Sequence, residues 1–291
     1  MTIGDRVFTV ANYLFLFAIL VIVAYPILYV TSASFSSPYA VSSGKMWIFP
    51  VDFNLRGYTA VFKNRQILRS FLNSVMITAA GTGLNIVLTI MAAYPLSRKT
   101  FYGRGVFTGI MAFTMFFSGG MVPTFLLIRD LHLYDSMWAL ILPGAVGVSN
   151  VIIARTYFQT SIPEELYEAG QLDGCSEAGF LLRIVLPLSV PIIAVLVMYY
   201  AVGHWNSYFN ALIYIKDQDK QILQVVLKNI LIESQMMEQM MVDVAEYEER
   251  QGLSDLLKYS TIVIGSLPML ILYPFVQKHF VKGVMVGAIK G

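Results

Sequence analysis

The chain has 291 residues, of which 57% are hydrophobic and only 13% carry a charged side chain. Soluble domains hold about 25% charged residues and need them to cover their surface, so this composition excludes a single large soluble core. The net charge of +2 without a long basic run gives no sign of nucleic-acid binding, and a lone cysteine, Cys175, excludes an internal disulfide bond.

In chain order, six long stretches without a charged side chain are predicted to be transmembrane helices. A bilayer core about 30 Å thick needs about 20 helical residues, and one charge at its centre costs on the order of 3 kcal/mol. The windows cover approximately residues 7–30, 71–96, 106–128, 136–154, 184–214 and 259–277. The sequence therefore predicts an all-α integral membrane protein that crosses the bilayer several times.

The first window follows Arg6 and resembles a signal peptide, but signal peptides have apolar cores of about 7–15 residues, so this longer run is predicted to be retained.

The second and third windows contain residues that affect helix geometry. In the second window, the small residues Ala79, Gly81 and Gly83 are expected to permit close helix approach. In the third window, Gly119, Gly120 and Pro123 are expected to disturb the helix near its outer end.

Basic residues predict which side each connection faces, because Lys and Arg concentrate in short cytoplasmic loops. The connection "SRKTFYGRG" contains three basic residues and no acidic one, whereas "RDLHLYD" contains one basic and two acidic residues. The first connection is therefore predicted to be cytoplasmic, and with it both termini and residues 155–183. Residues 33–70 and 215–258 are then predicted to be extracytoplasmic.

Residues 155–183 form a connection far longer than the 2–8 residues usual between packed helices. Ser161 and Glu164 fit a capping box, which predicts a short helix with Pro163 in its first turn. The glycines in "AGQLDG" permit a sharp bend, and a second helical piece is expected from Ser176. The connection is therefore predicted to be a helix, a bend and a second helix.

The predicted short helix has an apolar face and an acidic face. Ile162, Leu166 and Ala169 share one face at helical spacing, and three glutamates lie on the other: Glu164, Glu165 and Glu168. Such a helix suits insertion into a groove of a second protein. The alternative is a helix on the lipid surface, but those helices are typically rich in Lys and Arg.

The stretch "EAGQLDGCSEAGFLLRIVLP" resembles the EAA motif of ABC-importer permease subunits. That motif reads Glu-Ala-Ala, three residues, Gly, nine residues, Ile, any residue, Leu-Pro. The positions matched at the expected spacing are Glu168, Ala169, Gly174, Ile184, Leu186 and Pro187. Gly170 replaces the second Ala, which is expected to loosen the helix end while leaving the charge and the bend intact.

The resemblance covers nearly the whole chain and implies a type I ABC importer permease fold. The segments "GGMVPTFLLIRDLHLYDSMWALILPGA", "YAVGHWNSYFNALIYI" and "YPFVQKHFVKGVMVGAIKG" resemble the maltose-type carbohydrate-uptake branch, particularly permeases for oligosaccharides and polysaccharide fragments. This implies a multi-pass transport subunit of the bacterial plasma (inner) membrane. The implied partners are a second homologous permease subunit, two ABC ATPase subunits, an extracytoplasmic solute-binding protein, membrane lipid and the carbohydrate.

In this family the EAA loop seats in a cleft of the ATPase subunit, whose ATP-driven closure switches the membrane helices between inward-facing and outward-facing states. Glu168 would hydrogen-bond or ion-pair with the ATPase, while apolar neighbours such as Leu172 would fill a groove. The implied ATPase-coupling residues are Glu164, Glu165, Leu166, Glu168, Ala169, Gly174, Ile184, Leu186 and Pro187. No cofactor is expected on this chain, since it has no Walker lysine pattern; ATP and Mg belong to the ATPase.

Polar and aromatic residues within the predicted spans are candidates for the substrate path, because amides that face lipid are costly. Sugars stack their CH faces on aromatic rings and pair their hydroxyls with Asn or His. The candidates are Asn85, Tyr200, His204, Trp205, Asn206, Tyr208 and Asn210. An aromatic belt at the outer membrane surface is an open alternative for the cluster around Trp205. No metal site is expected, because neither Cys nor an acidic residue accompanies His204.

The two long outer segments are candidates for partner contacts. Residues 36–69 contain five basic residues and one acidic residue, which favours an acidic partner or an anionic glycan such as a uronate oligosaccharide, for example an alginate fragment. Residues 215–258 would either dock the solute-binding protein or pack on the partner permease, and the sequence leaves both open.

Two other function classes fit the sequence less well. An ion-coupled secondary transporter acting alone usually carries acidic residues or lysines within its spans, and the six windows hold none. An intramembrane enzyme needs a Ser/His/Asp set, paired carboxylates or an HExxH motif, which the windows also lack.

Overall fold

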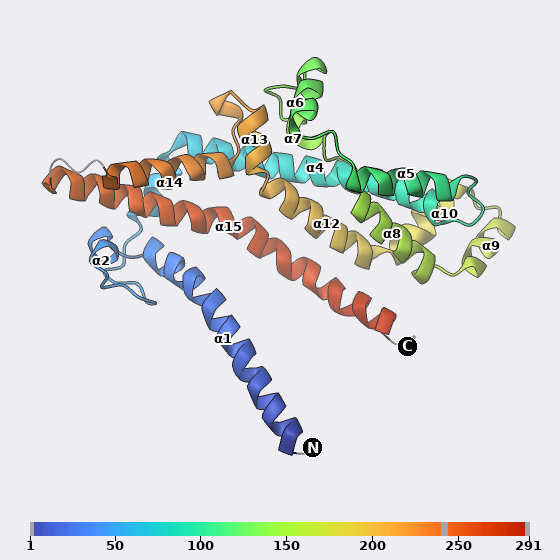
Figure 1. Cartoon of the computed structure of the whole chain (residues 1–291), viewed down its shortest axis with the longest axis horizontal. Helices are drawn as coiled ribbons and strands as arrows, with labels where there is room; N and C mark the ends of the chain where they lie inside the picture. Colours follow the sequence, from blue (N-terminus) through green and yellow to red (C-terminus); the bar gives the residue numbers. More distant parts are fainter. Residues whose placement is uncertain (1–2, 240–243, 289–291) are drawn as a thin grey trace. The chain divides into compact units, whose positions relative to one another are not determined.

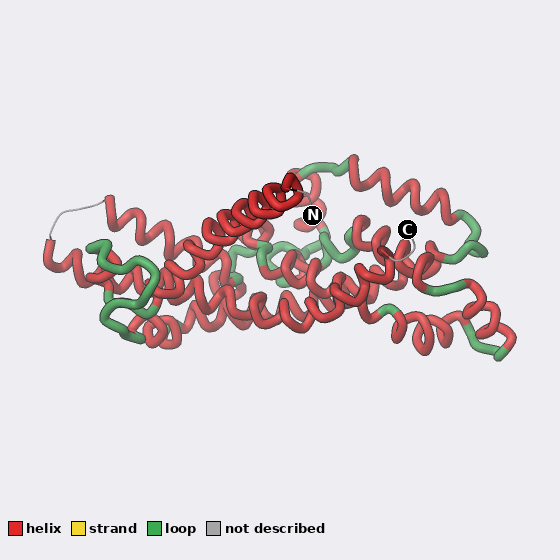
Figure 2. The backbone as a smooth tube through the Cα atoms, turned by 90° about the horizontal axis from the view of Figure 1, so that it is seen from below, coloured by secondary structure: helices red, strands yellow, loops and turns green. Residues whose placement is uncertain are grey.

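The computed structural model describes residues 3–239 and 244–288, and the regular elements in these ranges are helices. Figure 2 shows helices joined by loops, with no strand in the described part of the chain. The prediction of an all-α fold is therefore confirmed.

The chain divides into two compact units, one of residues 1–69 with 225–267 and one of residues 70–224 with 268–291. The helices labelled in Figure 1 fall mainly into one unit or the other. The first unit holds α1 (Ile3–Ser34), α2 (Pro38–Ser42), α3 (Arg56–Lys63), most of α14 (Leu223–Gln239) and part of α15 (Val244–Ala288). The second holds most of α4 (Arg65–Ser97), α5 (Arg104–Phe116), α6 (Met121–Asp130), α7 (Trp138–Ile141), α8 (Val148–Ser161), α9 (Glu164–Leu172), α10 (Glu177–Phe180), η1 (Leu181–Val185), α11 (Leu186–Leu188), α12 (Val190–Trp205), α13 (Tyr208–Tyr214) and η2 (Gln218–Lys220).

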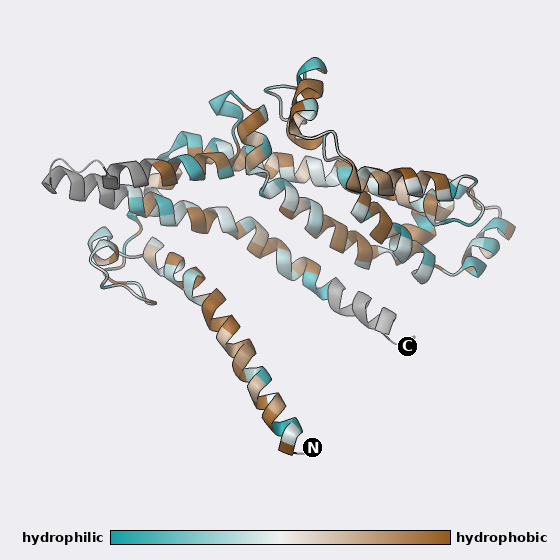
Figure 3. Ribbon diagram, in the orientation of Figure 1, coloured by the Kyte–Doolittle hydropathy of each residue, from teal (hydrophilic) through white to brown (hydrophobic). Residues whose placement is uncertain are grey.

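Among the described residues, three helices are long and apolar enough to cross a membrane: Ile3–Ser34, Arg65–Ser97 and Ser254–Lys278. They cover the first, second and sixth predicted windows. α1 is hydrophobic over most of its length (Figure 3), and no residue of its most apolar window is buried. Since soluble proteins rarely expose apolar surface of this extent, α1 is suited to a lipid environment.

The third predicted window is a bent helix pair rather than a straight helix, and so is the part of the fifth window up to Trp205, after which α13 forms a separate helix. α5 and α6 meet at 111°, and the break contains Gly119 and Gly120 as predicted, with a φ of +84° at Gly120. The helical stretches Glu177–Leu188 and Val190–Trp205 meet at 81° beside Pro191. If each bent pair is one span, the described residues contain up to five spans.

The fourth predicted window, residues 136–154, is not one continuous helix. α7 ends at Ile141, and α8 begins at Val148 and continues to Ser161. The intervening stretch "LPGAVG" contains Pro143, which has no N–H to donate to a helix, and two glycines, which are unfavourable in a helix interior. The structure therefore replaces one predicted helix by two shorter ones.

The core of the second unit joins the long connection after α8 to the membrane helices. Phe158 of α8, Phe180 of α10 and Leu196 of α12 have at most 2% of their surface exposed. The buried cluster consists of Ile90, Ala93, Tyr94, Leu96, Val151, Ala154, Phe158, Ile162, Tyr167, Phe180, Val185, Ile192, Leu196 and Tyr200. Because interiors of this kind are close-packed, the connection is held firmly against α4, α8 and α12.

Candidate functional site

Residues 162–188 form a bent segment at one end of the second unit, where Figure 1 shows α9 and α10. The predicted capping box at its start is not formed. Ser161 is the last residue of α8, and Pro163 precedes α9 without a side-chain hydrogen bond. Glu164 instead forms an ion pair with Lys99 at 2.5 Å, and this hydrogen bond raises the pKa of Lys99.

A Schellman motif ends α9 and sets the bend. The N–H of Gly174 donates to the Gln171 carbonyl at 3.0 Å, and the N–H of Cys175 donates to the Gly170 carbonyl at 2.9 Å. Gly174 has a φ of +72°, a left-handed conformation that glycine adopts without steric cost. Ser176 then caps α10 through its side chain, where the sequence predicts the second piece to begin.

Gly170 lies inside α9 rather than at the bend, so its predicted role in the bend is corrected. A Cβ on residue 170 would lie 2.9 Å from Cδ2 of Phe180, closer than real Cβ contacts. On the same face, the ring of Tyr167 is buried with its centroid 5.3 Å from that of Phe180. Glycine in place of the second Ala of the motif therefore allows α9 to approach α10 closely.

The opposite side of α9, its outer face, is exposed. Leu166 and Leu172 are 40% and 89% exposed, although both are apolar. The outer face consists of Glu165, Leu166, Glu168, Ala169 and Leu172. Ile162 was predicted to share the apolar face, but it is buried in the core because it directly follows α8, whose Phe158 packs there.

The remaining predicted coupling residues do not lie on the outer face. Ile184 and Leu186 are half-buried against the core, and Pro187 is exposed at the start of α11. These three residues join the bent segment to α12. Glu164 is half-buried beside Lys99.

Glu177 connects the bent segment to α4, a contact that the sequence reasoning missed. Its carboxylate accepts hydrogen bonds from the hydroxyl of Tyr94 at 3.0 Å and from the hydroxyl of Tyr167. The bond to Glu177 raises the pKa of Tyr167. The spacing of Tyr94 and Arg98 at i, i+4 indicates that they share one helix face, but nothing in the sequence identifies their partner.

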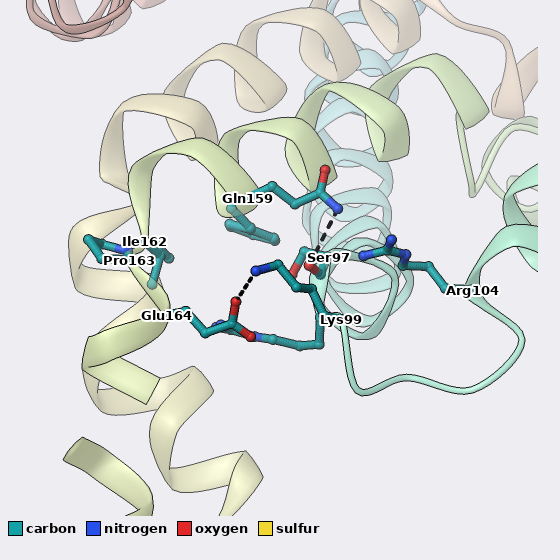
Figure 4. A pocket seen from close by; sticks show the side chains of 9 residues that line it. Ser97, Lys99, Arg104, Gln159, Ile162, Pro163 and Glu164 are labelled. Carbon is teal, nitrogen blue, oxygen red and sulfur yellow. Dashed lines mark hydrogen bonds and ion pairs between the residues drawn. The ribbon is translucent and has the colours of Figure 1, made fainter. Parts of the chain in front are cut away.

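A cavity of about 430 Å³ lies beside the bent segment (Figure 4). Figure 4 shows the ion pair between Lys99 and Glu164 and the hydrogen bond from Gln159 to the Ser97 carbonyl, which measures 3.4 Å. Arg104 at the start of α5 also lines the cavity. Basic groups outnumber acidic ones in its wall.

Three of the predicted substrate-path residues, Asn85, Tyr200 and His204, are brought together inside the second unit. The fully buried Asn85 donates hydrogen bonds to the carbonyls of Gly144 and Ala145 at 2.7 Å and 3.0 Å. Its Oδ1 lies 2.7 Å from Nε2 of His204. These bonds hold the non-helical stretch after α7 against α4 and α12.

Tyr200 supports the same stretch from α12. Its hydroxyl lies 2.6 Å from the hydroxyl of Thr89 and accepts a hydrogen bond from the N–H of Gly147 at 3.2 Å. Gly81 permits the close helix approach that the sequence predicts, because a Cβ there would lie 2.5 Å from Nε2 of His204. The two helices are therefore in direct contact at this level.

The other substrate-path candidates are dispersed. Trp205 is buried, with its ring centroid 5.9 Å from that of Phe71, whereas Tyr208 is half-buried and Asn206 is exposed. Asn210 is exposed and lines two cavities, one of about 200 Å³ that His204 also lines and one of about 300 Å³. Within the described ranges, no three His, Cys, Asp or Glu side chains are placed to hold a metal ion.

Known proteins match this chain over most or all of its length. The model of the family described as "Binding-protein-dependent transport system inner membrane component" matches residues 85–286. Protein LplC of Bacillus subtilis (strain 168) is 42% identical over 100% of this chain and 97% of its own length. The polygalacturonan/rhamnogalacturonan transport system permease protein YtcP of the same organism is 40% identical over 99% of both chains.

A solved structure matches at the level of the whole chain. It is the crystal structure of a bacterial ABC transporter involved in the import of the acidic polysaccharide alginate. The match has a TM-score of 0.86 and 32% sequence identity, and it covers 96% of this chain and 99% of the other.

Proposed function

The chain belongs to the family of binding-protein-dependent transport system inner membrane components, and we propose on this basis that it is the permease subunit of an ATP-driven carbohydrate importer. It is a membrane-spanning transport subunit rather than an enzyme. The observation that carries the proposal is the outer face of α9, which presents exposed leucines and glutamates from a segment anchored in the core.

The outer face of α9 is proposed to seat in a groove of a separate ATPase subunit. Leu166 and Leu172 would enter the groove, and Glu168 would pair with a basic or hydrogen-bonding group at its rim. Two such ATPase subunits, one for this chain and one for a second homologous permease, would move together when ATP binds. Because the Schellman motif at Gly174 fixes the angle between α9 and α10, α9 and α10 would move together as one rigid body.

We propose that the chain crosses a bacterial inner membrane six times with both termini in the cytoplasm. The fourth crossing would run through α7, the stretch "LPGAVG" and α8. Irregular backbone at membrane depth is tolerated where its polar groups are satisfied within the protein. The bonds from Asn85 to the carbonyls of Gly144 and Ala145 supply such partners.

A cysteine at Leu172 tests both the orientation and the docking surface. In a Cys175→Ala background, Leu172→Cys should react with a membrane-impermeant maleimide only after the cells are opened, and it should crosslink to the ATPase subunit. Phe53→Cys, which is also exposed but lies in the proposed outer segment, should react in intact cells. Labelling of Leu172→Cys in intact cells would contradict the orientation, and loss of the crosslink in Glu168→Ala would locate the contact on α9.

We propose that the transported carbohydrate is an acidic oligosaccharide delivered by an extracytoplasmic binding protein. Polygalacturonan and alginate, the polymers in the descriptions of two similar proteins, are both built from uronic acids. The outer segment 36–69 has a positive charge excess that favours an anionic ligand or partner. His204, Ser207 and Asn210 line the 200 Å³ cavity and offer groups that can bind sugar hydroxyls.

The substrate proposal predicts a difference between charged and neutral sugars of equal length. In proteoliposomes containing both permeases, the ATPases and the binding protein, an oligogalacturonate should stimulate ATP hydrolysis several-fold, and a neutral galactose oligomer of the same length should not. Equal stimulation by both sugars would remove the acidic assignment. Uptake by this chain alone, without ATP and along an ion gradient, would favour a secondary transporter instead.

A further inference from the structure

The contact between α4 and the bent segment has no part in docking, yet it joins three helices at one carboxylate. Glu177 at the start of α10 accepts the hydroxyl of Tyr94 in α4 at 3.0 Å and also the hydroxyl of Tyr167 in α9. The amide of Gln171 donates to the Tyr167 hydroxyl at 2.8 Å. Hydrogen bonds to a charged carboxylate are stronger than those between neutral groups, so this is a firm connection.

Arg98, one turn beyond Tyr94, adds a second connection between the same helices. Its guanidinium carbon lies 4.9 Å from the ring centroid of Tyr94, 5.0 Å from that of Tyr167 and 5.1 Å from that of Phe180. Cation–π attraction acts within about 6 Å of a ring centroid. The charged end of Arg98 therefore lies among one ring from α4, one from α9 and one from α10.

The covalent path from α9 to the membrane helices is less regular than this contact. Past α10, the chain continues through the π-helical turn η1 and then through the break at Ser189, where the helix direction changes by 81°. Irregular turns of this kind often mark hinges. A displacement of α9 that is transmitted only along the chain would therefore be partly lost as bending at these positions.

The helix α4, by contrast, runs uninterrupted between the bent segment and the cavity beside His204. Pro95 has no N–H to bond the Met91 carbonyl, but α4 continues through it as one helix from Arg65 to Ser97, and Tyr94 lies within that helix. Asn85, bonded to His204, lies nine positions before Tyr94, or about 14 Å along the helix axis. Thr89, between them, is bonded to Tyr200 of the cavity wall.

We propose that Tyr94, Arg98 and Glu177 are positioning residues that clamp the bent segment to α4, so that ATP-driven displacement of α9 moves α4 and with it the wall of the cavity. This inference rests on the proposed function, because it assumes that an ATPase moves α9. The clamp itself touches neither ATPase nor substrate. It decides how much of the displacement reaches the cavity.

The test measures the number of substrate molecules imported per ATP hydrolysed by the complete transporter in proteoliposomes. Tyr94→Phe keeps the ring against Arg98 but removes the hydroxyl that binds Glu177, and Glu177→Gln keeps the side-chain length but removes the charge. Each variant should retain its ATPase subunits and its melting temperature to within a few degrees, while import per ATP falls about fivefold, the effect of losing one hydrogen bond. Because both variants weaken the same contact between Tyr94 and Glu177, their effects should not add in the double variant.

Tyr102→Phe is the matched control, because Tyr102 lies in the loop after α4 and is 98% exposed; it should import at the wild-type ratio. A wild-type ratio in Tyr94→Phe and Glu177→Gln, with ATPases bound, would overturn the clamp while leaving the proposed function intact. A wild-type chain that binds no ATPase would instead overturn the proposed function, and the clamp with it. A merely structural contact would lower the melting temperature or the yield without changing the ratio.

Discussion

Replacing Gly174 by proline should abolish substrate uptake while leaving the protein in the membrane. Proline holds φ near −65°, whereas residue 174 has a φ of +72°, and proline cannot donate the hydrogen bond that Gly174 makes to Gln171. The cost of forming the native bend is then about 3 kcal/mol, or roughly a hundredfold in its population. Uptake in whole cells and the amount of ATPase that co-purifies with the membrane fraction measure the two effects.

Gly174→Asn separates the effect of the bend from that of losing a glycine. Asparagine tolerates left-handed backbone better than other residues with a Cβ, and a Cβ on residue 174 meets no atom within 4 Å. This variant should retain most of the uptake. Wild-type uptake in Gly174→Pro would show that the bend is not needed for coupling.

Replacing Asn85 by leucine should lower the thermal stability of the protein more than any substitution on the outer face of α9. Leucine can bind none of the three partners of the buried Asn85, the carbonyls of Gly144 and Ala145 and Nε2 of His204. Each buried polar group left unpaired costs about 1–3 kcal/mol. The melting temperature of the detergent-solubilised protein measures the loss.

Asn206→Leu is the control for this substitution, because Asn206 caps the end of α12, is exposed, and donates its amide to the Val202 carbonyl one turn earlier in that helix. Its melting temperature should stay close to that of the wild type. Equal melting temperatures for Asn85→Leu and Asn206→Leu would mean that Asn85 does not hold the stretch after α7. Asn85 would then be free to act as a substrate-path residue.

Together, these features describe two levels in the second unit. The outer face of α9 is exposed and chemically mixed, as a docking surface is. Behind it, Tyr94, Arg98 and Glu177 join the bent segment to α4, and Asn85 and Tyr200 join α4 to the stretch after α7 and to α12. A displacement of α9 can therefore pass through packed side chains and α4 to the cavity beside His204.

Local sequence patterns determined most of the helical architecture of this protein. Charge-free windows predicted the apolar helices α1 and α4 and the apolar part of α15, and Gly119 and Gly120 predicted the break between α5 and α6. The spacing of Glu168, Gly174 and Pro187 predicted an exposed glutamate on a short helix followed by a bend. These features depend on hydropathy, helical period and backbone preference, which are set by residues close together in the sequence.

Only the tertiary structure decided which side chains meet. Ile162 is buried rather than exposed, Gly170 serves close packing rather than the bend, and residues 136–154 are broken where a hydropathy window is continuous. Asn85 binds the backbone near residue 144, and Tyr94 binds Glu177, 83 positions away. The energy of such contacts depends on distances between helices far apart in the chain, and no local pattern of residues contains those distances.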